Sequence, residues 1–111
     1  MIAGGLYMPD PANLAKIRQE IDYNSEVLKK LIGNRKFKTL FDGFDESNKL
    51  KTMPKGYPKD HPEIELLKLK SFVVIHRFTD RQVVDKKFLK NVVAVAKNIK
   101  PLNDFLKEAI S

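Results

Sequence analysis

The sequence predicts an α+β domain in which four or five helices cover a small, mainly antiparallel sheet. The run Phe72-Val73-Val74-Ile75 is rich in β-branched residues and apolar on both faces, which is typical of a strand buried on both sides. Other segments repeat apolar residues every three or four positions, as amphipathic helices do. A chain of 111 residues has room for one hydrophobic core, so residues 1–111 are expected to form a single domain.

The chain is expected to begin with a strand followed directly by a helix. The strand covers about residues 2–8 and contains Gly4 and Gly5, which indicate a bulge or the close approach of another backbone. Asp10 can accept hydrogen bonds from the first-turn amides of the helix, and Pro11 suits the first helical position because its missing N–H needs no partner there.

Two further helical segments are expected before the middle of the chain. A break at residues 22–25 separates the first helix from a second one, which ends at Gly33. Phe37, Leu40 and Phe41 then fit a short helical turn.

The middle of the chain is predicted to contain two strands and a helix. Residues 49–53 can pair briefly as a strand, and the prolines and glycine of residues 54–58 then impose turns. Asp60 is placed as the N-cap of a helix, with Glu63 as its capping-box partner. The buried strand follows and is expected at about residues 72–78.

The last part of the chain is predicted to be one long helix. A capping box at Thr79-Asp80-Arg81-Gln82 first opens a short helical turn, and Asp85 caps the long helix. Apolar residues then recur without loss of phase from Phe88 to Ala109. Pro101 lies inside this run and costs about 3 kcal/mol in a straight helix. We therefore expect a kink or tight break near Pro101 rather than a change of direction.

The positive charge is concentrated in the second part of the chain. Basic and acidic residues balance in residues 1–48, whereas residues 49–111 carry fourteen Lys or Arg and seven Asp or Glu and hold the whole net charge of +7. Such an excess favours an anionic partner, although lysines also keep small domains soluble. Arginine, which makes bidentate contacts with phosphate and guanine, supplies only four cations, so the case for nucleic acid is weak.

His61 and His76 are the only histidines, and therefore the only side chains that titrate near neutral pH without a shift. His61 stands at the predicted helix start, where it could act as a general acid or base or help to bind an anion; the alternative is an ordinary surface position. His76 ends the buried strand and is expected to be partly buried and hydrogen-bonded. Tyr57 offers a face for stacking, and a basic cleft could be lined by Lys49, Lys51, Lys55, Lys59, Lys68 and Lys70.

Several classes of site are excluded by the residues present. Without cysteine the chain has no disulfide, thiolate metal site or thiol nucleophile. It has no His-x₃-His pair, P-loop, dinucleotide fingerprint or G-x-S-x-G motif, so we expect no metal and no cofactor. No apolar run approaches the roughly 18 residues that span a bilayer, and no signal peptide is recognisable. We expect a cytoplasmic protein without a membrane partner.

Two motifs resemble those of a known family. They are Gly4-Gly5-Leu6-Tyr7-Met8-Pro9 and Leu50-Lys51-Thr52-Met53-Pro54-Lys55-Gly56-Tyr57, the second continuing to Asp60-His61-Pro62. Over essentially its whole length the chain is similar to the bacterial and fungal family called domain of unknown function 2461, which has no established activity. The resemblance implies that the chain is the C-terminal portion of a longer domain. It also implies recurrent polar positions at Lys51, Lys55, His61 and Lys70.

Two functions are compatible with these expectations. The first is a non-catalytic module that binds an anionic partner through a basic groove formed by Lys51, Lys55, Lys70 and Tyr57. The second is an enzyme acting on an anionic, phosphate- or carboxylate-bearing substrate, with His61 as acid or base. The first strand would also leave a sheet edge uncovered, which favours a homo-oligomer formed through that strand.

Overall fold

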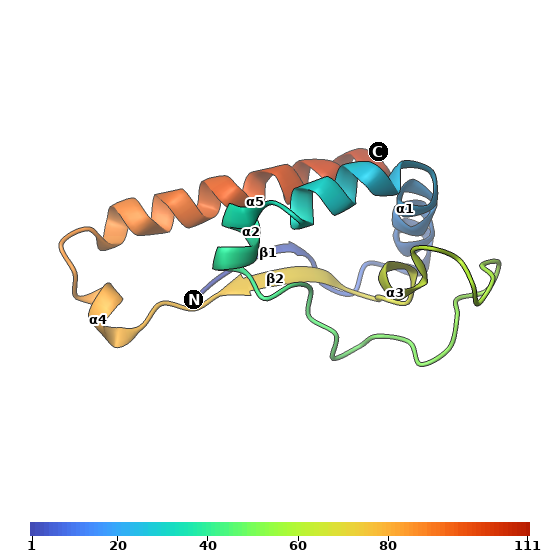
Figure 1. Ribbon diagram of the computed structural model, residues 1–111, viewed down its shortest axis with the longest axis horizontal. Coiled ribbons are helices and arrows are strands. Elements are labelled where there is room, and N and C mark those ends of the chain that lie inside the picture. The colour runs from blue at the N-terminus through green and yellow to red at the C-terminus, as the bar shows by residue number, and fades with distance from the viewer.

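The computed structural model describes residues 1–111 and shows the α+β fold that the sequence predicts. The elements, in chain order, are β1 Ile2–Leu6, α1 Pro11–Ile32, α2 Arg35–Leu40, α3 Ile64–Leu67, β2 Phe72–His76, α4 Asp80–Val83 and α5 Phe88–Ile110. Figure 1 shows the long helix α5 lying along the two-stranded sheet. The sheet and α5 therefore form the frame on which the other elements are placed.

The sheet consists of β1 and β2, which pair antiparallel and in continuous register, with Gly4 opposite Val74. Close approach of neighbouring elements accounts for the two glycines. A Cβ on Gly4 would clash with Cγ2 of Ile99 on α5, and a Cβ on Gly5 would clash with the carbonyl oxygen of Phe72. The glycine pair thus lets β1 lie against both β2 and α5.

Residues 49–53 do not form the third strand that the sequence predicts. The Leu50 N–H donates to the carbonyl oxygen of Lys68, just after α3, at 2.9 Å. The second edge of β2 is instead approached by the loop after α2, where the Asp45 N–H donates to the carbonyl oxygen of Val73 at 2.9 Å. That loop occupies the position a third strand would take, so the prediction of a strand at residues 49–53 is wrong.

Helix α1 begins where the sequence predicts and bends within the predicted break. The Asp10 carboxylate accepts the Asn13 N–H at 2.8 Å, and Pro11 takes the first position. Asn24 leaves helical geometry, with φ −128° and ψ 39°. Figure 1 shows the two halves of α1 running in different directions. The first half reaches α3, where Arg18 bonds the end of that helix, and the second half runs beside α5.

Helix α3 is shorter than predicted and is not capped by Asp60. Glu63 occupies the N-cap position and makes no side-chain capping bond. Turns precede the helix, because the His61 N–H donates to the carbonyl oxygen of Pro58 and the Ile64 N–H donates to that of His61, both at 3.1 Å. The local hydrogen bonds of this segment therefore centre on His61, and the predicted capping box does not form.

The C-terminal helices follow the prediction more closely. At α4, the Thr79 hydroxyl accepts the Gln82 N–H at 3.2 Å, and the Gln82 amide oxygen accepts the Thr79 N–H at 2.8 Å. The prediction that Asp85 caps α5 is wrong, because Lys87 occupies the N-cap position and makes no side-chain capping bond. The Asp85 carboxylate accepts the Lys87 N–H at 2.7 Å in the turn before the helix. Helix α5 then continues through Pro101 as one helix, so the chain keeps its direction there as expected and no tight break occurs.

The hydrophobic core lies between α5, α1 and the sheet. Its fully buried members include Ile17 and Ile21 of α1, Phe72 of β2, and Leu102 of α5. The molecule is elongated, measuring 50 × 25 × 24 Å. Figure 1 shows α4 and the start of α5 projecting at one end, with α3 and the loop before it at the other. None of the helices combines the length and hydrophobicity that crossing a bilayer requires.

Candidate functional site

His61 lies where the loop before α3 meets helix α1. Its Nε2 is 2.6 Å from a carboxylate oxygen of Asp22, and its Nδ1 accepts the Glu63 N–H at 3.0 Å. The imidazole is 14% exposed. Two bonds from opposite sides therefore hold the ring in place and fasten the loop to α1.

These two bonds also determine the tautomer of the neutral His61 ring. A backbone N–H can only donate, so Nδ1 carries the lone pair and the ring proton resides on Nε2, which donates to Asp22. The neutral imidazole then has no free lone pair with which to accept a substrate proton. To act as a general acid or base, it would first have to release Glu63 or Asp22.

Tyr57 and Arg18 complete the surroundings of the His61–Asp22 pair. The Tyr57 ring meets the imidazole edge-on, with centroids 6.0 Å apart. Burial, and after it the Asp22 carboxylate, raises the pKa of the Tyr57 phenol, while Arg18 opposes this shift. Burial lowers the pKa of the Arg18 guanidinium, whose Nε donates to the carbonyl oxygen of Leu67 at 2.8 Å. The cluster is therefore closely bonded and joins α1 to the region around α3.

His76 is partly buried, as the sequence predicts. Its Nδ1 lies 2.8 Å from the carbonyl oxygen of Leu40, to which it donates. The ring packs edge-on against Phe78 and Phe41, with centroid separations of 4.6 and 6.3 Å. His76 therefore fastens the end of α2 to β2.

A separate hollow of about 320 Å³, the lysine hollow, lies beside α3 and is lined by Lys51, Thr52, Met53, Lys59, Ile64 and Lys68. Of its three cations, Lys68 is 3.3 Å from the Glu65 carboxylate. Lys51 and Lys59 are exposed and form no ion pair. Two unpaired ammonium groups on one hollow attract an anion both by charge and by charge-assisted hydrogen bonding.

The residues that the sequence predicts as one site are divided in the structure. Lys51 lines the lysine hollow, whereas Tyr57 packs against His61 in the cluster with Asp22. Lys55 is exposed on the turn between these two places, and Lys70 is half-buried just before β2; neither lines the lysine hollow. The structure therefore presents a bonded histidine cluster and a lysine hollow rather than one basic groove.

Asp22 and Arg18 are the part of the histidine cluster that the sequence-based prediction lacks. They stand four residues apart on α1, a spacing that places two side chains on the same helix face. The predicted break at residues 22–25 placed Asp22 outside that helix, so the sequence did not indicate that Arg18 and Asp22 share a helix face. The structure puts the bend at Asn24, which leaves Asp22 on the first half of α1.

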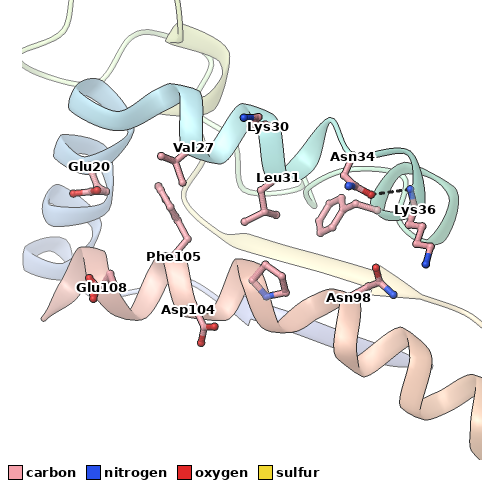
Figure 2. Close-up of a pocket in the computed structure, with 12 residues that line it drawn as sticks. Glu20, Val27, Lys30, Leu31, Asn34, Lys36, Asn98, Asp104, Phe105 and Glu108 are labelled. Carbon is pink, nitrogen blue, oxygen red and sulfur yellow. Dashed lines mark hydrogen bonds between the residues drawn. The ribbon is translucent and has the colours of Figure 1, made fainter.

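A larger groove of about 710 Å³ runs between the second half of α1, α2 and α5. Figure 2 shows Val27 and Phe105 pointing into it from the two facing helices. Glu20 and Glu108 lie toward one end and Lys36 toward the other. No cluster of three or more acidic or histidine side chains in the molecule is arranged to hold a metal ion. The groove therefore combines apolar side chains such as Val27 and Phe105 with polar and charged ones along its length.

Comparison with known proteins gives a family match. Residues 1–105 match the family described as "Conserved hypothetical protein (DUF2461)". No curated protein and no solved structure matches the chain. The matched residues extend from β1 into the last turns of α5, and so include both the histidine cluster and the lysine hollow.

Proposed function

The chain belongs to the DUF2461 family of conserved hypothetical proteins, and we propose that it is a cytoplasmic, non-catalytic module that binds an anionic partner through the lysine hollow. The observation that carries this proposal is the pair of exposed cations, Lys51 and Lys59, which line one hollow and form no ion pair. Lys68 adds a third ammonium group whose charge is partly offset by Glu65.

The geometry supports binding better than catalysis. An enzyme using His61 as acid or base needs a ring nitrogen free to exchange a proton with the substrate. Both ring nitrogens of His61 are engaged, one by Asp22 and the other by Glu63. The Asp22 bond resembles the carboxylate–histidine pairs of enzymes, but here the nitrogen that would face a substrate is bonded to the backbone.

The size of the lysine hollow defines the class of ligand. A volume of about 320 Å³ is at the lower end of small-molecule sites. Lysine is a point-charge donor that suits phosphate and carboxylate groups without requiring a planar partner. We therefore infer a compact phosphate- or carboxylate-bearing group as the ligand, whether free or displayed on a larger partner.

Calorimetric titration with inorganic phosphate and with tripolyphosphate tests this proposal. We expect tripolyphosphate to bind in a salt-dependent manner. The double variant Lys51→Glu/Lys59→Glu should bind tripolyphosphate with an affinity at least about tenfold lower than that of the wild type. The matched double variant Lys38→Glu/Lys107→Glu has the same net charge change at exposed lysines outside the hollow, and it should bind nearly as well as the wild type. If both double variants lost tripolyphosphate affinity equally, the loss would reflect net charge and not the lysine hollow, which would contradict the proposal.

His61→Ala separates the binding module from an enzyme. The substitution removes the bonds to Asp22 and Glu63, so we expect it to lower the free energy of unfolding by about 1–3 kcal/mol. Tripolyphosphate affinity should be unchanged, because His61 does not line the lysine hollow. If the variant were fully stable but no longer bound tripolyphosphate, His61 would belong to a ligand site and the catalytic alternative would gain support.

A further inference from the structure

One end of the molecule, residues 77–97, has a surface that is both apolar and basic. This basic tip contains α4, the turn after it and the first half of α5, and Figure 1 shows it projecting at the end opposite α3. Four large apolar side chains are exposed there, namely Val83 (50%), Val84 (83%), Leu89 (74%) and Val93 (45%). Contiguous exposed apolar patches mark contact surfaces, and these four side chains all belong to one projecting segment of the chain.

Six cations belong to the same segment as these apolar side chains, together with only two acidic residues, Asp80 and Asp85. All six are exposed and none forms an ion pair. They are Arg77, Arg81, Lys86, Lys87, Lys90 and Lys97. The Asp85 carboxylate is itself occupied by the Lys87 N–H. The basic tip therefore carries much of the excess positive charge of the chain, without neutralising partners.

Helix periodicity places apolar and basic groups together on the outer side of α5. Leu89, Val93 and Lys97 follow one another at steps of four residues and so share one face. Phe88 lies on another face and packs edge-on against Phe78, with ring centroids 5.2 Å apart. The face that turns away from the body thus presents apolar side chains with ammonium groups beside them.

We propose that the basic tip binds the surface of a bilayer that contains anionic phospholipids. Lysines and arginines near such a surface are each attracted to the lipid headgroups, and valine and leucine side chains gain from burial just below them. The long lysine side chains can remain at headgroup level while the apolar side chains enter. This is peripheral contact, which requires no membrane-spanning helix, and it revises the sequence-based expectation of no membrane partner.

The chemistry of the basic tip favours lipid over other anionic partners. Single-stranded nucleic acid is bound by exposed aromatic rings between the cations, whereas the exposed apolar side chains here are aliphatic and Phe78 and Phe88 pack against each other. A second copy of the chain would bring the same unpaired cations together, and like charges repel. An anionic bilayer supplies both the negative charge and the apolar layer.

Co-sedimentation of the full chain with vesicles tests the proposal. We expect the chain to bind vesicles of phosphatidylcholine mixed with phosphatidylserine. Its affinity for vesicles of phosphatidylcholine alone should be at least about tenfold lower. The uncharged variant Val84→Gln/Leu89→Gln and the charge variant Lys86→Glu/Lys87→Glu should each weaken binding to the mixed vesicles about tenfold or more. The matched controls Tyr23→Gln/Val27→Gln and Lys38→Glu/Lys107→Glu lie outside the basic tip and should bind like the wild type. Circular dichroism confirms that each variant is folded.

Every other result contradicts the proposal. Binding that survives the Val84/Leu89 substitutions would be charge adsorption without insertion, and equal binding to both vesicle types would remove the role of the cations. Binding to duplex or single-stranded DNA but not to vesicles would assign the basic tip to nucleic acid. Lys51→Glu/Lys59→Glu should retain vesicle binding, so a failure of the lysine hollow and a failure of the basic tip can be told apart.

Discussion

Two adjacent glycines limit how β1 packs, and each does so for a different reason. A side chain on Gly4 would meet the buried Ile99 side chain of α5, whereas one on Gly5 would meet the rigid backbone of Phe72. Gly5 also has φ +100°, a conformation that residues with a Cβ rarely adopt. At this scale a single methyl group decides whether the strand can lie between β2 and α5.

Alanine substitutions at the glycines test this account. We expect Gly4→Ala to lower the free energy of unfolding by about 1–3 kcal/mol, and Gly5→Ala to lower it by more because strain adds to the clash. Gly43 has φ +107° with nothing within 4 Å of its added Cβ, so Gly43→Ala should cost only about 1 kcal/mol. Urea denaturation measures all three. Equal losses at Gly5 and Gly43 would show that backbone strain, and not the clash, determines the effect.

Tyr57 is expected to make stability depend on pH in the alkaline range. Burial and the Asp22 carboxylate disfavour its phenolate, so the pKa of Tyr57 in the folded state lies above its ordinary value of 10.0. The folded protein then holds the proton more tightly than the unfolded chain does. This contribution to stability is complete below the unfolded-state pKa and is lost as the pH rises through the folded-state pKa.

The substitution Tyr57→Phe checks that expectation. Denaturation of the wild type from neutral pH upward should show a fall in the free energy of unfolding above about pH 10 that the variant lacks. Phenolate absorbance, taken as the difference between wild type and variant, reports the titration of Tyr57 directly. A Tyr57 midpoint at or below its ordinary value would contradict the arrangement around Asp22.

The long helix α5 contains a proline that removes one backbone hydrogen bond. Pro101 is exposed and lies in the middle of a helix that packs on β1, α1 and α2. Its ring occupies the place of the N–H that would donate to the carbonyl oxygen of Lys97. The apolar face keeps its phase across this position, with Ile99 and Leu102 both buried, so packing rather than helix propensity maintains α5 here.

Replacing the proline should therefore stabilise α5. We expect Pro101→Ala to raise the free energy of unfolding by up to about 3 kcal/mol, because it restores the donor and leaves no cavity at an exposed site. Ala96→Pro, at another exposed position in the same helix, should lower it by a similar amount. Thermal and urea denaturation measure both. A Pro101→Ala variant that is neutral or less stable would mean that the missing backbone hydrogen bond does not limit the stability of α5.

At the scale of the whole molecule, β1 presents one strand edge that β2 does not cover. The Gly5 N–H points to this outer side, where the Asn103 side-chain oxygen accepts it at 2.9 Å. Since successive residues of a strand alternate in direction, the Ala3 N–H points to the same side, and Ala3 is exposed. We propose that two copies pair through this edge, as edge strands commonly do.

Light scattering over a range of concentrations tests the pairing. We expect the wild type to shift from monomer toward dimer as its concentration rises, and Ala3→Pro, which lacks the donor, to stay monomeric. Ala3→Ser keeps the N–H and serves as the control. The monomer should be elongated, with a radius of gyration near 15.2 Å compared with about 13 Å for a typical compact domain of this size. A wild type that is monomeric throughout would refute the edge pairing.

The elongated shape also separates the two proposed binding surfaces. The lysine hollow lies beside α3, whereas the basic tip is formed by α4 and the start of α5 at the opposite end (Figure 1). A chain bound to lipid through the basic tip would therefore still expose the lysine hollow. Each surface can be altered without touching the other, which keeps the two sets of experiments independent.

Local sequence patterns were sufficient to predict the features that depend on neighbouring residues. Asp10 caps α1, Thr79 and Gln82 form the capping box of α4, and the apolar repeat specifies α5 as one helix. Each of these rests on hydrogen bonds or packing faces spaced by a few residues, which periodicity and capping preferences report directly. The α+β class follows from the same local signals.

Contacts between groups that lie far apart in the chain could not be predicted in this way. His61 is bonded by Asp22, 39 residues away, and this bond joins the loop before α3 to α1. The loop after α2, rather than residues 49–53, approaches β2. Lys51 is therefore not part of a strand, and it lines the lysine hollow instead. Such pairings depend on how elements are oriented relative to one another. The orientation is determined by the combined packing of the core, which no local pattern in the chain contains.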